Sequence, residues 1–156
     1  MSQIPEAYKK GFINFINCKI DLSNKVLIPR SETEKKKKKV IQEIKKKKEK
    51  VKILDIFAGS GCIGVAICKN IKNLCSEIHF SDKEIEAISQ IKKNLEINNI
   101  PKEKYKIFQS SFFNKIKDSY DIIVANPPYV AKKRIEEVGE SVLEYEPHQA
   151  LFSGED

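Results

Sequence analysis

The sequence predicts an α/β fold in which a parallel β-sheet carries helices on both of its faces. Short apolar runs at residues 51–57, 76–81, 105–109 and 121–125 each have the length of a buried strand. Segments with helical spacing of apolar residues separate the first three runs, and a loop precedes the last. Parallel strands need long crossover connections, so this alternation favours a parallel sheet.

The N-terminal segment predicts a β-hairpin. A short helix or turn is expected first, followed by a strand through Phe12–Leu22. Val26–Arg30 is expected to be a second strand, which ends because Pro29 has no backbone N–H to donate. Ser23 and Asn24 are typical turn residues, so we expect the hairpin turn there.

A helix is predicted from Ser31 to Lys50. A serine followed by acidic residues in the first turn is a helix start signal. The apolar stripe of this helix is narrow, and two lysine runs, 35–39 and 45–48, are expected to face water. The stripe consists of Val40, Ile41 and Ile44.

Two further helices are predicted, after the first and second apolar runs. The first begins at the Gly59–Gly61 turn, and the second covers residues 83–98. Both have apolar residues at helical spacing. In the first these are Ile63, Ala66, Ile67 and Ile71, and in the second Ile85, Ile88, Ile91 and Leu95.

Composition excludes some classes of protein. The 156 residues (17.9 kDa) contain no apolar run of ~18 residues and no signal-like N-terminus, which predicts neither membrane insertion nor export. The net charge of +7 comes almost wholly from lysine. We favour a solvated surface over an RNA contact through the lysine-rich helix, because phosphate-binding surfaces tend to use arginine as well. The four cysteines form no C-x-x-C pair, so buried free thiols are expected rather than a metal site.

The turn between Asp55 and Gly61 has the character of a cofactor loop. Glycines let the backbone approach a ligand, and the following helix N-terminus offers free N–H groups. Asp82 ends the next strand, 21 residues beyond Gly61, where a carboxylate can accept two ribose hydroxyls. This pair favours a cofactor that contains adenosine. The alternatives are tight packing for the glycines and a helix N-cap for Asp82.

A dinucleotide fingerprint can also be matched to this turn. Gly59, Gly61 and Gly64 have the Gly-x-Gly-x-x-Gly spacing of NAD-binding proteins. The segment Asn126–Tyr129 weighs against hydride transfer, because such a site has no need of it.

Asn126-Pro127-Pro128-Tyr129 follows the last apolar run. Neither proline can donate to a sheet, so the strand must stop there. Asn126 precedes a proline and is held in an extended conformation. An amide and an aromatic ring on a stiff backbone at a strand end can hold a flat group that forms hydrogen bonds.

The chain resembles the HemK/PrmC group of S-adenosylmethionine-dependent glutamine methyltransferases, which act on class I peptide chain release factors. The resemblance rests on motifs in the family's order over most of residues 8–156. They are Tyr8-x-x-Gly11-x-x-x-Phe15, Pro29-Arg30-Ser31-Glu32-Thr33-Glu34, the loop within Leu54–Ile63, Asp82, Asn126–Tyr129 and Glu146-Pro147-x-x-Ala150-Leu151.

The resemblance implies a Rossmann-like class I methyltransferase sheet preceded by a short β-hairpin. Residues 1–34 would be the hairpin and linker segment. Residues 35–156 would be the S-adenosylmethionine-binding domain, incomplete at its C-terminus because strands of the family fold are missing. The implied activity is methyl transfer from S-adenosyl-L-methionine to the glutamine amide nitrogen of a release factor's Gly-Gly-Gln motif. The expected protein is cytoplasmic and monomeric, and it uses no metal.

The resemblance also implies roles for individual residues. The Asn126 side-chain oxygen and the Pro127 carbonyl would accept the two amide hydrogens of the substrate, while Tyr129 packs on the amide plane. Phe112 would stack on adenine. The implied catalytic residues are Asn126, Pro127 and Tyr129, and Pro128 joins them in binding substrate. The implied cofactor-binding residues are Asp55, Phe57, Ala58, Gly59, Ser60, Gly61, Asp82, Ser111, Phe112 and Asn126.

Several positions depart from the family pattern. Phe57 replaces the first glycine of the loop, Ala58 a common threonine, Ser111 an aspartate and Ser31 a proline. The Phe-Ala-Gly-Ser-Gly loop also resembles that of rRNA guanine-N2 methyltransferases. An rRNA or DNA amino-group methyltransferase (N2-guanine or N6-adenine) is therefore the alternative function, and an inactive truncated cofactor-binding domain is the second.

Overall fold

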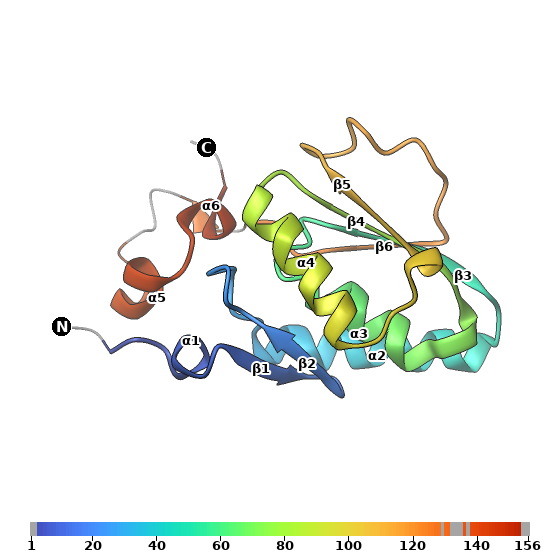
Figure 1. Ribbon diagram of the computed structural model, residues 1–156, viewed down its shortest axis with the longest axis horizontal. Helices are drawn as coiled ribbons and strands as arrows, with labels where there is room; N and C mark the ends of the chain where they lie inside the picture. The colour runs from blue at the N-terminus through green and yellow to red at the C-terminus, as the bar shows by residue number, and fades with distance from the viewer. Residues whose placement is uncertain (1–2, 129, 132–135, 137, 154–156) are drawn as a thin grey trace.

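A four-stranded parallel sheet forms the centre of the computed structural model, which describes residues 3–128, 130–131, 136 and 138–153 (Figure 1). The strand order is β5-β4-β3-β6, and each neighbouring pair is parallel. This confirms the predicted α/β class with a parallel sheet, but the long helices of the described residues cover one face of it rather than both. The strands are β3 (Val51–Ile56), β4 (Cys75–Asp82), β5 (Tyr105–Gln109) and β6 (Ile122–Ala125).

Three long helices lie on one side of this sheet (Figure 1): α2 (Ser31–Lys47), α3 (Cys62–Ile71) and α4 (Ile85–Ile97). A short 3-10 turn at Lys72–Leu74 connects α3 to β4, and another at Lys102–Lys104 lies between α4 and β5. One buried cluster joins strands and helices. It includes Ile41, Ile44, Ile53, Ile67, Ile78, Phe80, Ile91, Leu95 and Val124.

Two expectations for apolar residues are wrong. Ile85 was expected on the buried side of α4, but it is the first residue of the helix and its side chain is 54% exposed. The last strand was expected to be buried throughout, but Ile123 is 53% exposed. Among the described strands β6 is an edge strand that pairs only with β3, and the three long helices lie against the opposite face.

The hairpin exists, but its position differs from the prediction. Helix α1 (Glu6–Lys10) leads into β1 (Phe12–Phe15), which pairs antiparallel with β2 (Cys18–Asp21). Ile16 and Asn17 form the turn with φ of 44° and 61°. A two-residue hairpin turn with both φ values positive matches the twist of the strands, and asparagine favours it.

Residues 26–30 do not form the predicted strand, and two of their backbone groups bond to side chains instead. The Tyr8 hydroxyl donates to the Val26 carbonyl at 2.7 Å. The Ile28 N–H donates to a Glu146 carboxylate oxygen at 3.0 Å. Both contacts join segments far apart in the sequence.

Side-chain amides from α4 and its C-terminal cap complete the outer edge of β2. Asn94 accepts the Asp21 N–H at 2.7 Å and donates to the Asp21 carbonyl at 3.1 Å. Asn98 repeats this pattern with Lys19, at 3.3 Å and 2.9 Å. The asparagines lie four residues apart, on one face of the helix, so they meet alternate residues of the strand. Asn94 also donates to the Ser60 carbonyl at 2.8 Å, which ties the hairpin to the glycine turn.

The tail after β6 contains elements that the sequence did not predict. They are α5 (Glu140–Tyr145), α6 (His148–Leu151) and a parallel pair of β7 (Val130–Ala131) with β8 (Phe152–Ser153). These elements are four or fewer residues long apart from α5, so they give no periodic signal.

All four cysteines are free and buried, as predicted. Burial raises the pKa of Cys18 to about 11 and that of Cys62 to about 12. No helix in the described part of the chain is both long and apolar enough to cross a membrane.

We predict that Asn94→Leu lowers the free energy of unfolding by about 2–4 kcal/mol, because it leaves the Asp21 N–H and two carbonyls without their partner. Urea unfolding followed by circular dichroism measures the change. Glu96→Gln, an exposed substitution on the same helix, is the control and should shift stability by less than ~0.5 kcal/mol. Equal stability of the two variants would contradict the bridging role of Asn94.

Candidate active site at the carboxyl ends of the strands

The β3–α3 turn takes the conformation of a glycine loop even where it lacks glycine. Phe57, Gly59 and Gly61 all have left-handed backbones, with φ of 55°, 55° and 75°. This conformation suits glycine but strains a bulky residue by about 1–2 kcal/mol. Phe57 therefore adopts a backbone conformation that glycine takes more easily.

Asp82, at the end of β4, holds this turn in place. One carboxylate oxygen accepts the Gly59 N–H at 2.9 Å, and the other accepts the Glu84 N–H at 3.1 Å. Each oxygen of a carboxylate can accept a second donor. Asp82 is half-buried, so it can both fix the loop and accept two hydroxyl groups from a ligand.

Asp55 lies beneath the turn and is fully buried. One of its oxygens accepts the Gly64 N–H at 2.8 Å, whereas the other has no partner among the described residues. Burial raises the pKa of Asp55 to about 7. A buried carboxyl oxygen without a partner, next to a helix N-terminus, can accept a hydrogen bond from a ligand or an ordered water.

Gly64 is a packing residue. A Cβ at this position would lie 2.4 Å from the Phe80 ring and 2.9 Å from Ile78. The third glycine of the fingerprint spacing therefore lets α3 approach β4, and it supports the packing alternative for this glycine.

An aromatic pair stands beside the turn. The rings of Phe57 and Phe112 meet edge to face, with centroids 5.5 Å apart and an interplanar angle of 88°. Phe112 is 65% exposed, so one face of its ring is open to a flat ligand. The Ser111 side chain is also exposed.

A shallow hollow of about 290 Å³ lies at the ends of β4 and β5. Its lining joins Lys83, which follows Asp82, to Ser111, which precedes Phe112. Five of its six lining residues were not predicted, and their only signal in the sequence is that they end or follow a strand. They are Lys83, Gln109, Ser110, Asn114 and Lys115.

Asn126 and Pro127 are at the same edge of the sheet. Ala125 is opposite Ile56 in the parallel register of β6 and β3. The two strands therefore leave the sheet side by side, at Asn126 and Phe57. Asn126 is half-buried, and its side-chain amide has no partner in the described part of the chain. The structure thus brings Asn126 next to the glycine turn. Tyr129 lies outside the described residues.

An ion pair connects two of the sequence motifs. Arg30 contacts the Glu146 carboxylate at 2.6 Å, and the other Glu146 oxygen accepts the Ile28 N–H. The Glu146 side chain is 1% exposed. Burial, together with the nearby Glu146 carboxylate, raises the pKa of the Tyr8 phenol. The sequence identified both motifs but gave no sign that they bind each other.

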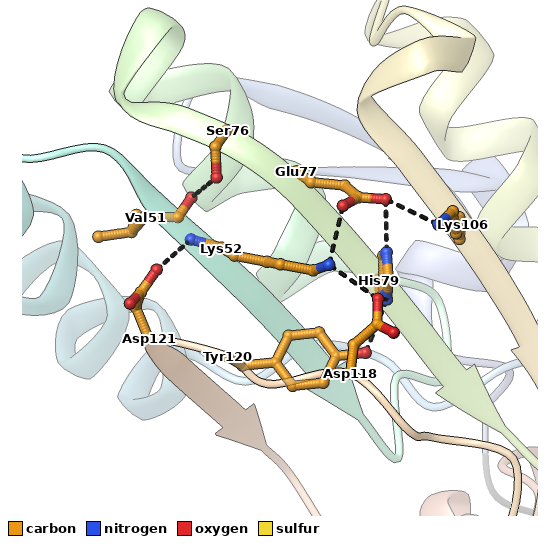
Figure 2. Close-up of polar contacts among 9 residues, drawn as sticks. All are labelled: Val51, Lys52, Ser76, Glu77, His79, Lys106, Asp118, Tyr120 and Asp121. Carbon is orange, nitrogen blue, oxygen red and sulfur yellow. Dashed lines mark hydrogen bonds and ion pairs between the residues drawn. The ribbon is translucent and has the colours of Figure 1, made fainter.

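A second polar cluster is remote from this site, toward the amino ends of β3 and β4 (Figure 2). Glu77, His79 and Asp118 are the described residues with metal-binding groups close together. Lys52 lies between the two carboxylates, 3.0 Å from Glu77 and 2.7 Å from Asp118. His79 contacts Tyr120 and Glu77 at 2.6 and 2.7 Å. Lysine already supplies the positive charge that these acids need.

The sheet order, the glycine turn after β3 and the acid at the end of β4 together define a class I methyltransferase fold. The hMettl16 catalytic domain in complex with MAT2A 3'UTR hairpin 6 superposes with a TM-score of 0.63 at 17% identity, over 88% of this chain and 51% of that one. Methanocaldococcus jannaschii Trm5 in complex with adenosine superposes with a TM-score of 0.56 at 22% identity, over 87% of this chain and 38% of that one. These likenesses establish the fold.

The model of the methyltransferase small domain family matches residues 17–154, and the chain belongs to this family. The release factor glutamine methyltransferase of Lactococcus lactis is 39% identical over 149 residues, which are 96% of this chain and 53% of the relative. That of Flavobacterium psychrophilum is 36% identical over 154 residues, 96% and 52%. The chain spans about half the length of these relatives. They confirm the HemK/PrmC resemblance.

We predict that Asp55 makes stability fall as pH rises from about 4 to 7. Its folded pKa of about 7 lies above its ordinary value of ~3.9, so in this range the folded protein binds a proton that the unfolded chain lacks. The loss reaches about 4 kcal/mol, at ~1.4 kcal/mol per pKa unit, and stops above pH 7.

The test is urea unfolding of wild type and Asp55→Asn at pH 4, 5.5 and 7. The stability difference between them should change with pH, because asparagine does not titrate. Glu103→Gln, at an exposed position, should follow wild type throughout. A constant difference between Asp55→Asn and wild type would contradict the raised pKa.

We predict that Glu146→Ala exposes the Ile28 amide to hydrogen exchange and lowers stability by about 3 kcal/mol. The substitution removes the acceptor of that amide and the partner of Arg30 from a buried position. Exchange at Ile28, measured by NMR, should become at least tenfold faster. Glu140→Ala, at an exposed site in α5, should leave it unchanged, and the same protection in both variants would refute the contact.

Proposed function

We propose that the chain is part of an S-adenosylmethionine-dependent methyltransferase that methylates the glutamine amide nitrogen in the Gly-Gly-Gln motif of class I peptide chain release factors. The observation that carries this proposal is the position of Asn126-Pro127-Pro128 beside the glycine turn. The relatives support the proposal because they are named release factor glutamine methyltransferases. A cytoplasmic, monomeric enzyme without a metal is part of the proposal.

The residues at the strand ends fit such a cofactor. Asp82 keeps lone pairs for the ribose hydroxyls, Phe112 offers an open ring to adenine, and polar and charged residues line the hollow beside them. S-adenosylmethionine supplies an electrophilic methyl group on a sulfonium. The turn from Phe57 to Gly61, with the buried Asp55 beneath it, would hold the rest of the cofactor.

Asn126 and Pro127 would orient the substrate. An amide nitrogen is a weak nucleophile because its lone pair is delocalised, so alignment with the methyl group is the main requirement. The Asn126 side-chain oxygen and the Pro127 carbonyl would accept the two N–H groups of the glutamine. Both oxygens would also stabilise positive charge that develops on nitrogen. Pro128 stiffens the segment, and Tyr129 would pack on the amide plane.

The second candidate is a nucleic-acid amino methyltransferase, which the positive charge of the chain and the Phe-Ala-Gly-Ser-Gly loop favour. The deciding experiment incubates the full-length gene product with radiolabelled S-adenosylmethionine, a purified release factor and ribosomal RNA. Label on the glutamine of the Gly-Gly-Gln motif supports the proposal. Label on RNA replaces it with the second candidate. Label on neither favours an inactive cofactor-binding domain.

We predict that Asn126→Ala reduces methyl transfer to the release factor by at least ~10³-fold while the affinity for cofactor stays within about threefold. The loss comes from orientation and charge stabilisation, which act in the transition state. Single-turnover assays measure transfer, and calorimetry measures cofactor affinity. Asn73→Ala, at an exposed position away from the site, should match wild type in both. Equal losses of transfer and affinity for Asn126→Ala would show that it serves the cofactor instead.

A further inference from the structure

Almost all of the net charge of the chain lies on one segment. Residues 31–50 contain ten lysines and four glutamates, so they carry +6 of the total +7. The rest of the chain has 19 basic and 18 acidic residues and is nearly neutral. A general bias toward lysine would raise its content everywhere. It does not explain why acidic residues balance lysine everywhere except in this segment.

Lysines in the two parts of the molecule have different partners. In the β3–β4 cluster Glu77 pairs with both Lys52 and Lys106, and Asp118 pairs with Lys52 (Figure 2). On α2 the structure records ion pairs only for two lysines, Lys38 with Glu34 at 3.1 Å and Lys46 with Glu43 at 3.0 Å. The other lysines of residues 31–50 have no ion pair among the described residues. They are Lys35, Lys36, Lys37, Lys39, Lys45, Lys47, Lys48 and Lys50.

The apolar side of α2 is already used. Ile41 and Ile44 are 5% and 4% exposed and belong to the main buried cluster. None of the large exposed apolar side chains in the described residues lies on α2. Helices that bind membrane surfaces insert apolar side chains into the lipid boundary, and α2 has none free. The exposed surface of α2 therefore carries mostly lysine side chains on a helix that the core holds in place.

We propose that this lysine face of α2 binds the phosphate backbone of RNA. The 17-residue helix is about 25 Å long, which corresponds to about seven phosphates of one strand at ~3.4 Å each. Uncompensated ammonium groups on one helix repel each other, and a polyanion relieves that repulsion. Residues 31–50 contain no arginine for bidentate recognition of bases, so binding is independent of sequence and steeply dependent on salt.

The surface contains none of the residues of the candidate active site, although its first turns lie near that site. Burial raises the pKa of the Asp55 carboxyl, and Lys37 is close enough to act to lower it. Helix α2 then runs from Ser31 to Lys47 and leads into the amino end of β3. The inference rests on charge and exposure, and it does not depend on the proposed methyl transfer.

The test measures binding of a fluorescent 30-nucleotide RNA of mixed sequence by anisotropy, between 50 and 300 mM KCl. In the α2 variant, Lys35, Lys36, Lys39 and Lys47 become Gln. In the matched control, the exposed Lys9, Lys92, Lys102 and Lys117 become Gln. Both variants have the same net charge. A third variant carries Arg at the four α2 positions and keeps the charge.

We predict that the α2 variant binds RNA at least ~30-fold more weakly than wild type at 100 mM KCl, and that its slope of log affinity against log salt is shallower by two or more, at ~0.7 per lost phosphate contact. The control should stay within about threefold, and the Arg variant should bind like wild type. Circular dichroism confirms that each variant is folded.

Three outcomes would overturn the proposal. Equal losses in the α2 variant and the control would mean that net charge alone attracts RNA. No binding of RNA by wild type at 50 mM KCl would remove the partner. Stronger binding to phosphatidylglycerol vesicles than to RNA, lost in the α2 variant, would assign the surface to a membrane instead.

Discussion

The buried amide of Asn94 connects the parts of the molecule that must be held in register. It bonds to both backbone groups of Asp21 in the hairpin and to the Ser60 carbonyl in the glycine turn. A backbone edge that is buried without partners is unstable, so the hairpin can dock only where α4 offers amides at the right spacing. The hairpin, α4 and the glycine turn are consequently tied together through this one side chain.

Strand β3 determines where the candidate site lies. It pairs with β4 on one side and β6 on the other. The chain adds β4 and then β5 on one side of β3 and returns to the other side for β6, so the strand order reverses at β3. Ligands bind at such a switch point, because the loops from the two flanking strands diverge there and leave a crevice. Asp82 reaches the crevice from one side and Asn126 from the other, and the two candidate roles, cofactor and substrate, follow from that division.

The sequence predicted the parallel sheet, its strands and the residues at their ends. Apolar runs mark strands, and glycines and prolines mark where strands end, and both are local signals. It misplaced the hairpin turn, since Ile16 gives no sign that it can adopt a positive φ. It also could not reveal that Arg30 binds Glu146, because that pairing depends on the path of the chain between them. The exposure of Ile123 had no local signal either, since it depends on which elements cover β6.

The reactivity of the four buried cysteines can report local unfolding of the protein. A thiol reacts as the thiolate, and the raised pKa values of Cys18 and Cys62 suppress that form while the fold excludes reagent. Cys18 is in the hairpin, Cys62 and Cys68 are in α3, and Cys75 begins β4, so each thiol becomes accessible to reagent only when its own element detaches. The order in which they are alkylated therefore records the sequence in which the hairpin, the cofactor loop and the central sheet come apart.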